Sequence, residues 1–119
     1  MNDKLKFRAW YEGRYIYKDL CNSNYYTEDG KCIGLANTLP NDLPWEQCTG
    51  LKDKNGKLIY EGDILKDIYG VLKIVYWDEQ YSSLRVKYQD NTHCGIIWQQ
   101  YVDVYEMEVI GNIHENQEL

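Results

Sequence analysis

Residues 49–64, Thr-Gly-Leu-Lys-Asp-Lys-Asn-Gly-Lys-Leu-Ile-Tyr-Glu-Gly-Asp-Ile, place two turn signals around a short apolar run. Asn55-Gly56 is typical of a two-residue hairpin turn, because both central residues of that turn need positive φ and Asn and Gly tolerate it best. Glu61-Gly62-Asp63 predicts a second bend, after which an apolar-rich segment begins. A bend that leads into a run of short strands is a common opening of a small β-barrel.

From residue 58 onward the pattern predicts short strands at regular spacing. The strands are expected at residues 58–60, 63–69, 71–77, 84–88, 93–98 and 107–113, with one helical turn at residues 99–105. Short strands at this spacing, with a single helical turn before the last one, match a five-stranded SH3-like barrel, and closing the barrel removes the exposed sheet edges. An OB-fold is the main alternative, but it normally carries a longer helix, for which this chain has no amphipathic run.

The N-terminal part predicts a β-hairpin. Residues 4–10 alternate, with Leu5, Phe7 and Ala9 on one face and Lys4, Lys6 and Arg8 on the other. Glu12-Gly13 turns the chain, and residues 14–18 return as a second strand. Residues 25–27 and 31–33 each suit a further short strand. The fold class is therefore mainly β, α+β at most.

Residues 37–44, Asn-Thr-Leu-Pro-Asn-Asp-Leu-Pro, contain both prolines of the chain. Each proline disfavours the α region for the residue before it, so a connector is expected here rather than a helix. This connector separates two predicted parts of one compact structural unit. They are an N-terminal hairpin with an irregular connector, residues 1–44, and a C-terminal five-stranded SH3-like barrel, residues 45–119.

The net charge of −6 narrows the classes of partner. An acidic chain is repelled by phosphate backbones and anionic lipid, which disfavours a generic nucleic-acid or membrane binder. No apolar run approaches the about 18 residues of a membrane span, and the first residues do not read as a signal peptide. The expected location is the cytoplasm, with reduced thiols.

Few residues suggest catalytic or metal chemistry. Cys21, Cys32, Cys48 and Cys94 lack the close spacing of a zinc knuckle or a CxxC site. His93 adjoins Cys94, but neighbouring residues of a strand point to opposite faces and cannot form a catalytic dyad; His114 approaches Cys94 only if their strands pair. The carboxylates of Glu61 and Asp63 suit bonds to their own backbone amides. No catalytic, metal or cofactor-binding residue is predicted, and the protein is not expected to be an enzyme.

Twelve Tyr and four Trp are an unusual share of aromatic side chains. Tyrosine suits sheet packing, and it also suits a contact surface, because its ring packs while its hydroxyl reaches a partner. Basic and aromatic residues near turns and strand ends form the candidate contact surface: Lys52, Lys54, Tyr60, Trp77, Tyr81 and Trp98. Within it, the lysines of residues 51–57 beside Tyr60 suit contacts with nucleic acid.

Four blocks in order resemble the YopX family: residues 6–10 (Lys-Phe-Arg-Ala-Trp), 49–56 (Thr-Gly-Leu-Lys-Asp-Lys-Asn-Gly), 59–64 (Ile-Tyr-Glu-Gly-Asp-Ile) and 108–113 (Glu-Val-Ile-Gly-Asn-Ile). The family consists of small proteins of phages and prophages of Gram-positive bacteria. The resemblance spans nearly the whole chain and implies a YopX-like fold with a mainly β C-terminal part. It implies no activity and assigns no site residue.

Three functions remain open. The first is a phage-encoded binding or regulatory protein that acts on a host or phage protein, for example a host defence component, in an infected or lysogenic bacterium. The alternatives are a nucleic-acid-associated regulator that uses the barrel and a binder of a small nucleotide-like ligand. A protein partner is expected, a homo-oligomer is compatible with the sequence, and nucleic acid is less favoured.

Overall fold

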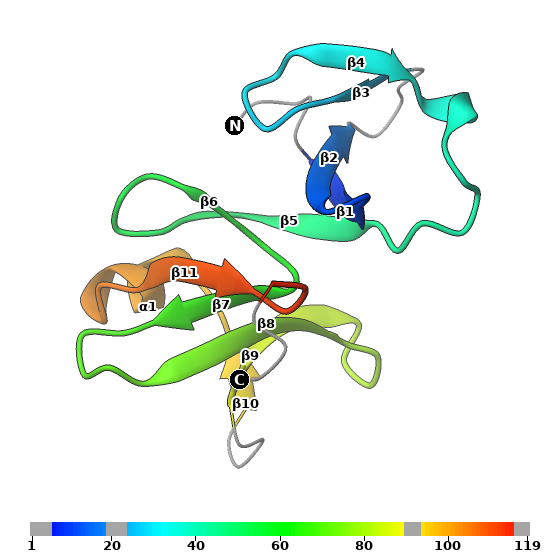
Figure 1. The fold of residues 1–119 in the computed structure, drawn as a ribbon. Coiled ribbons are helices and arrows are strands. Elements are labelled where there is room, and N and C mark those ends of the chain that lie inside the picture. The colour runs from blue at the N-terminus through cyan, green and yellow to red at the C-terminus, as the bar shows by residue number, and fades with distance from the viewer. Residues whose placement is uncertain (1–5, 19–23, 90–93, 116–119) are drawn as a thin grey trace. The chain divides into compact units, whose positions relative to one another are not determined.

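The computed structural model describes residues 6–18, 24–89 and 94–115 and is mainly β, as predicted (Figure 1). The chain divides into two compact units, Met1–Cys48 and Thr49–Leu119. Strand β5 (Glu46–Lys52) runs through the boundary between them.

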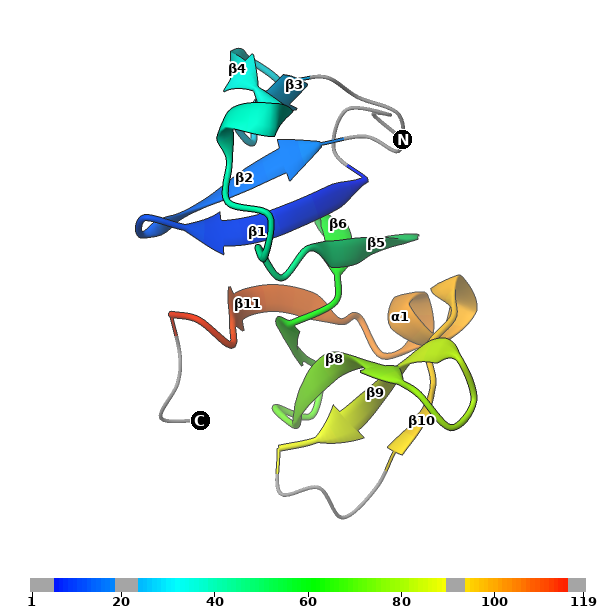
Figure 2. The same cartoon turned by 90° about the vertical axis from the view of Figure 1, so that its right-hand side faces the viewer.

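The first unit is an antiparallel sheet with the strand order β4-β3-β2-β1-β5. Its elements are β1 (Phe7–Tyr11), β2 (Arg14–Lys18), β3 (Asn24–Tyr26), β4 (Cys32–Leu35) and the short 3-10 helix η2 (Ala36–Thr38). β1 and β2 form the predicted hairpin, drawn in blue in Figure 2. Its small core consists of Ala9, Ile16 and Leu39, with tyrosine, leucine, isoleucine and tryptophan side chains packed around them.

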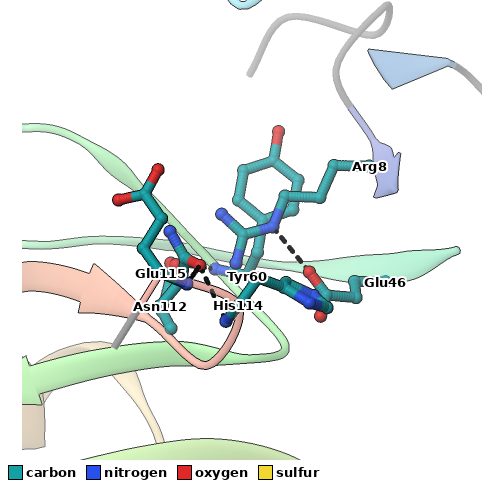
Figure 3. Close-up of polar contacts among 7 residues, drawn as sticks. Arg8, Glu46, Tyr60, Asn112, His114 and Glu115 are labelled. Carbon is teal, nitrogen blue, oxygen red and sulfur yellow. Dashed lines mark hydrogen bonds and ion pairs between the residues drawn. The ribbon is translucent and has the colours of Figure 1, made fainter. Parts of the chain in front are cut away.

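Arg8 departs from the expected solvent-facing position. It is buried, and its Nε donates a hydrogen bond to Glu46 Oε1 over 3.0 Å (Figure 3). The two residues lie directly opposite each other where β1 pairs with β5, and the Arg8 guanidinium also lies 3.9 Å from the Tyr15 ring centroid. The alternating pattern failed here because both faces of β1 are covered at this point, as the burial of the adjacent residues Arg8 and Ala9 shows, and the opposite charge of Glu46 compensates the buried arginine.

The second unit contains the rest of β5, which forms a hairpin with β6 (Leu58–Tyr60), and a five-stranded antiparallel sheet. The sheet has the order β10-β9-β8-β7-β11. Its strands are β7 (Asp63–Lys66), β8 (Leu72–Asp78), β9 (Ser83–Tyr88), β10 (Cys94–Ile96) and β11 (Glu108–Asn112). The predicted strands and the helical turn before the last one are confirmed, since α1 (Gln99–Val104) precedes β11. The sheet is open, with β10 and β11 at its two edges.

The core of the second unit is formed by one face of this sheet together with α1 and β6. It consists of Ile59, Leu65, Val75, Val86, Ile97, Val102 and Met107, all buried. Val75 and Val86 face each other across β8 and β9, and Val102 is the buried residue of α1. Side chains at alternate positions of these strands therefore point either to the core or to the opposite face of the sheet.

Three hairpin loops share one geometry, at residues 27–31, 53–57 and 67–71. In each, the first residue's N–H donates to the carbonyl of the fifth, at 2.9, 2.8 and 3.1 Å. The N–H of the glycine at the fourth position donates to the carbonyl of the first, at 2.9, 3.0 and 3.0 Å. These glycines, Gly30, Gly56 and Gly70, have φ of 89°, 81° and 80°, a left-handed conformation that glycine adopts without steric cost.

The two-residue turn predicted at Asn55-Gly56 is wrong in detail. Gly56 has positive φ, but Asn55 does not. The Asp53 carboxylate selects the longer loop, because its Oδ1 accepts hydrogen bonds from the N–H groups of Asn55 and Lys57, each at 2.9 Å. Its Oδ2 accepts a third from Val109 N–H, also at 2.9 Å, and so fastens the loop to β11.

The second predicted bend is confirmed. Gly62 has a φ of 88°, and its N–H donates to Val75 O over 2.8 Å. The buried Asp63 carboxylate accepts a 2.8 Å hydrogen bond from Tyr60 N–H, so this carboxylate stabilises the bend. Asn112 of β11 pairs with Asp63 beside this bend, and its Oδ1 accepts hydrogen bonds from the N–H groups of His114 and Glu115, each at 3.0 Å (Figure 3).

Candidate functional site

Four aromatic rings of the second unit follow one another in contact: Tyr69, Tyr105, Tyr101 and Trp98, named here the aromatic strip. Tyr69 and Tyr105 meet edge to face with ring centroids 6.3 Å apart, and Tyr105 and Tyr101 do so at 5.1 Å. Tyr101 and Trp98 are stacked, with centroids 5.1 Å apart and an interplanar angle of 28°. Aromatic pairs prefer these arrangements.

The local fold brings these rings together from two segments. Tyr101 and Tyr105 lie four residues apart and therefore on one side of the helical turn. Tyr69 is in the β7–β8 loop, which is tied to the end of the helix because Ile68 N–H donates to Tyr105 O over 2.8 Å. Asp67 shapes that loop, since its Oδ1 accepts hydrogen bonds from the N–H groups of Tyr69 (2.9 Å) and Val71 (3.0 Å).

The start of α1 is fixed to the β5–β6 hairpin by Gln99. Its Oε1 accepts a hydrogen bond from Lys52 N–H at 3.0 Å, and its Nε2 donates to Lys52 O at 2.8 Å. One side chain thus satisfies both backbone groups of Lys52, as a neighbouring strand would. These bonds anchor the residue that follows Trp98, the last ring of the strip.

A buried lysine supports the strip from inside. The Lys73 side chain is 3% exposed, and its Nζ lies 2.8 Å from Tyr101 Oη and 3.2 Å from Asp67 Oδ2. The same atom lies 4.9, 5.0 and 5.6 Å from the ring centroids of Tyr101, Tyr105 and Tyr88. Burial lowers the pKa of Lys73, but the hydrogen bonds with Tyr101 and Asp67 outweigh it, so the net pKa is raised and the ammonium stays charged.

The outer side of the strip is open to solvent. Tyr69 is 78% exposed and Trp98 is 51% exposed, so both ends of the series are accessible. Ile68 and Val104, from the same loop and the same helix, are exposed as well. Exposed apolar side chains gathered in this way mark an interaction surface more often than single exposed residues do.

The predicted contact residues do not form one surface. Trp98 belongs to the aromatic strip, whereas Trp77 lies near the end of β8 and Tyr81 in the β8–β9 turn; both are exposed. Lys52 and Lys54 are exposed on the β5–β6 hairpin, and Lys54 Nζ lies 4.0 Å from Glu108 Oε1. The prediction that Tyr60 belongs to a contact surface is wrong, because this residue is 4% exposed and its ring is not accessible to a partner.

The residues that sequence reasoning missed are Tyr69, Tyr101, Tyr105, Asp67 and Lys73. Two signals were available. The i, i+4 tyrosine pair stands on a predicted helical turn, and Asp67 begins a five-residue loop that repeats the Asp-x-x-Gly pattern of Asp53. The sequence gave no such signal for Lys73. It lies two residues before the core residue Val75 and so on the same face of β8, but a lysine is expected to face solvent.

Cys94 and His114, the remaining candidates for a nucleophilic dyad, lie at opposite edges of the five-stranded sheet. Cys94 lies on β10, and His114 follows β11, at the opposite edge of the five-stranded sheet, so the pairing that the dyad needs does not occur. His93 lies outside the described residues. Over residues 6–18, 24–89 and 94–115, no group of three or more His, Cys, Asp or Glu side chains is placed to hold a metal ion. None of the helices in the described part of the chain is long and apolar enough to cross a membrane.

These features define a small, mainly β protein with two open antiparallel sheets and an exposed aromatic strip on its C-terminal unit. The family model described as "YopX protein" matches residues 6–119, and the chain belongs to the YopX family, as its sequence blocks indicated. No curated protein matches the chain.

Proposed function

We propose that this protein is a non-enzymatic binding and regulatory protein that holds another protein against the aromatic strip. The observation that carries the proposal is the continuity of four rings whose two end members, Tyr69 and Trp98, are widely exposed. Tyr and Trp are enriched among the residues that dominate binding energy at protein interfaces.

Order within the strip supports the same function. The Lys73 ammonium touches Tyr101 and Tyr105, and the Asp67 loop fixes the backbone of Tyr69. Side chains that are already held in one arrangement lose little conformational entropy when a partner binds. The strip therefore suits a preformed contact surface better than a patch of freely rotating tyrosines would.

The setting of the proposal is a phage or prophage protein in the cytoplasm of an infected or lysogenic bacterium. We take the partner to be a host or phage protein, for example a host defence component. The second unit is proposed to be an SH3-like barrel. Its support is that β11 returns after α1 to pair with β7, the first strand of the sheet, while β8, β9 and β10 follow as a meander.

The test is affinity capture from infected cells with three forms of the full chain. The strip variant Tyr69→Ala/Trp98→Ala should lose the co-purified protein. The control variant Trp77→Ala/Tyr81→Ala removes the same types of exposed ring elsewhere on the unit and should keep it. Thermal unfolding of both variants shows whether they are folded. A partner that the strip variant retains as well as the wild type does would refute the proposed surface.

A further inference from the structure

The five-stranded sheet has a second face, opposite the core, that carries both cations and rings. Tyr76, Arg85 and Ile96 lie side by side across β8, β9 and β10, and Ile74, Lys87 and Cys94 form the adjacent row. These rows alternate with the buried pair Val75 and Val86, so they point away from the core. These six residues, together with Tyr81 in the β8–β9 turn, are named here the outer face.

Each cation of the outer face lies against a tyrosine ring. The Arg85 guanidinium is 4.1 Å from the Tyr81 ring centroid, and Lys87 Nζ is 5.1 Å from the Tyr76 centroid. Tyr81 and Ile96 are exposed, and Arg85 and Lys87 are half-buried beside them, so an incoming group meets ring and aliphatic surface with two cations at its edge.

The Asp78 carboxylate lies at the end of this face, and a neighbouring cation and several hydrogen-bond donors compensate its negative charge. Asp78 Oδ2 is 3.8 Å from Arg85 Nε and accepts a hydrogen bond from Tyr76 Oη at 3.3 Å. Its Oδ1 accepts hydrogen bonds from the N–H groups of Gln80 (2.9 Å) and Tyr81 (3.4 Å). The carboxylate thus shapes the turn that presents Tyr81.

We infer that the outer face binds single-stranded nucleic acid, with bases stacked on Tyr81 and phosphates beside Arg85 and Lys87. Interleaved rings and cations are the combination that single-stranded binders use, because every base offers a ring face and every linkage a negative charge. Two cations on a chain of net charge −6 are too few to hold a duplex, whose binding needs many phosphate contacts.

The inference also replaces the nucleic-acid surface expected around residues 51–57. Tyr60 is buried and provides no stacking surface, and Lys54 lies beside the Glu108 carboxylate. On the outer face Tyr81 is exposed and can stack, although Arg85, like Lys54, has a carboxylate close by, since Asp78 Oδ2 lies 3.8 Å from its Nε. The outer face is separate from the aromatic strip, so the inference does not depend on the proposed protein partner.

The experiment measures fluorescence anisotropy of labelled single-stranded oligo(dT) with the full chain at low and rising salt. Two neutralised phosphates predict a slope of log affinity against log salt of about −1.4. Arg85→Gln/Lys87→Gln should abolish measurable binding. The matched control Lys52→Gln/Lys54→Gln removes the same charge from the β5–β6 hairpin and should bind as the wild type does. Tyr81→Ala, at an exposed turn, should weaken binding roughly tenfold through lost stacking.

Several results would overturn the inference. These are the absence of binding at low salt, an equal loss in the Lys52→Gln/Lys54→Gln control, and unchanged binding by Tyr81→Ala. Equal competition by duplex DNA, by poly-glutamate or by thymidine monophosphate would likewise show that the face does not select a single strand. Tyr81→Ala changes one exposed side chain and should not affect folding. It therefore tests binding at the outer face even if Arg85→Gln/Lys87→Gln fails to fold.

Discussion

Asp53 offers the sharpest test of how the second unit is held together. Its carboxylate is 6% exposed and accepts three backbone hydrogen bonds, two within its own loop and one from Val109 on β11. Asp53→Ala removes all three acceptors. Asp53→Asn keeps one oxygen for the loop but turns an NH₂ group toward the N–H of Val109, where two donors then face each other.

The loss of stability in each variant depends on whether the N–H groups that Asp53 had bound can reach water instead. A hydrogen bond to a charged group contributes about 1.5–3 kcal/mol, and a buried donor left unpaired costs about 1–3 kcal/mol. The loop N–H groups of Asn55 and Lys57 regain water, whereas Val109 lies in a strand, part-buried. We expect a loss of about 3 kcal/mol in the free energy of unfolding for Asp53→Ala and about 2 kcal/mol for Asp53→Asn.

Urea unfolding followed by tryptophan fluorescence measures both losses. With a slope near 1.5 kcal/mol per molar urea, the alanine variant should unfold at about 2 M lower urea. Asn55→Ala is the matched control, since Asn55 is in the same loop and its side chain makes one exposed hydrogen bond, to Glu108. It should change stability by less than about 0.5 kcal/mol. An Asp53→Ala protein within 1 kcal/mol of the wild type would show that the loop does not anchor β11.

Three further changes test other parts of the unit. Gly62→Val should lower stability by more than about 1 kcal/mol, because a β-branched residue resists a φ of 88°, and an unchanged melting temperature would contradict the bend. Lys73→Met should cost about 3 kcal/mol by leaving the Asp67 carboxylate unpaired, and Asp67→Asn added to it should recover part of that loss in urea unfolding. Burial, with a smaller contribution from the hydrogen bond with Cys94, raises the pKa of Tyr76 from 10.0 to about 12. The folded protein therefore holds this proton longer than the unfolded chain does, and stability falls as pH rises from 10 to 12. Tyr76→Phe should reduce that alkaline loss, and an unchanged dependence of the urea midpoint on pH would exclude the effect.

The sequence predicted the strands because their signals are local. Alternation placed the β1–β2 hairpin and β9, and the glycines at turns placed the ends of most other strands. The Glu61-Gly62-Asp63 bend was predictable for the same reason, since the Asp63 carboxylate bonds a backbone amide three residues away. Local chemistry that acts over a few residues can be read along the chain.

The site was not predictable to the same degree, because its contacts join distant residues. Asp53 meets Val109 across 56 positions, and Lys73 meets Tyr101 across 28. A lysine in a strand indicates a solvent-facing side chain, and only the tertiary structure shows that a carboxylate and tyrosines surround this one. The prediction for Tyr60 was wrong for the opposite reason. An aromatic residue beside lysines in the sequence indicates an exposed contact surface, but Tyr60 is buried in the structure.

The aromatic strip contacts Lys73 on the core side of the sheet, and the outer face is the opposite side, which makes the two proposed surfaces separable. Lys73 and Tyr88 oppose each other on the core side of β8 and β9, beneath the strip, whereas Arg85 points to the outer face. Side chains on opposite faces of a strand share no partner, so their contributions should add within about 0.5 kcal/mol. Trp98→Ala should leave oligo(dT) affinity unchanged, and Arg85→Gln/Lys87→Gln should leave capture of the protein partner unchanged. A strip variant that also loses oligo(dT) would show that one continuous surface serves both ligands, and the assignment of separate faces would then be wrong.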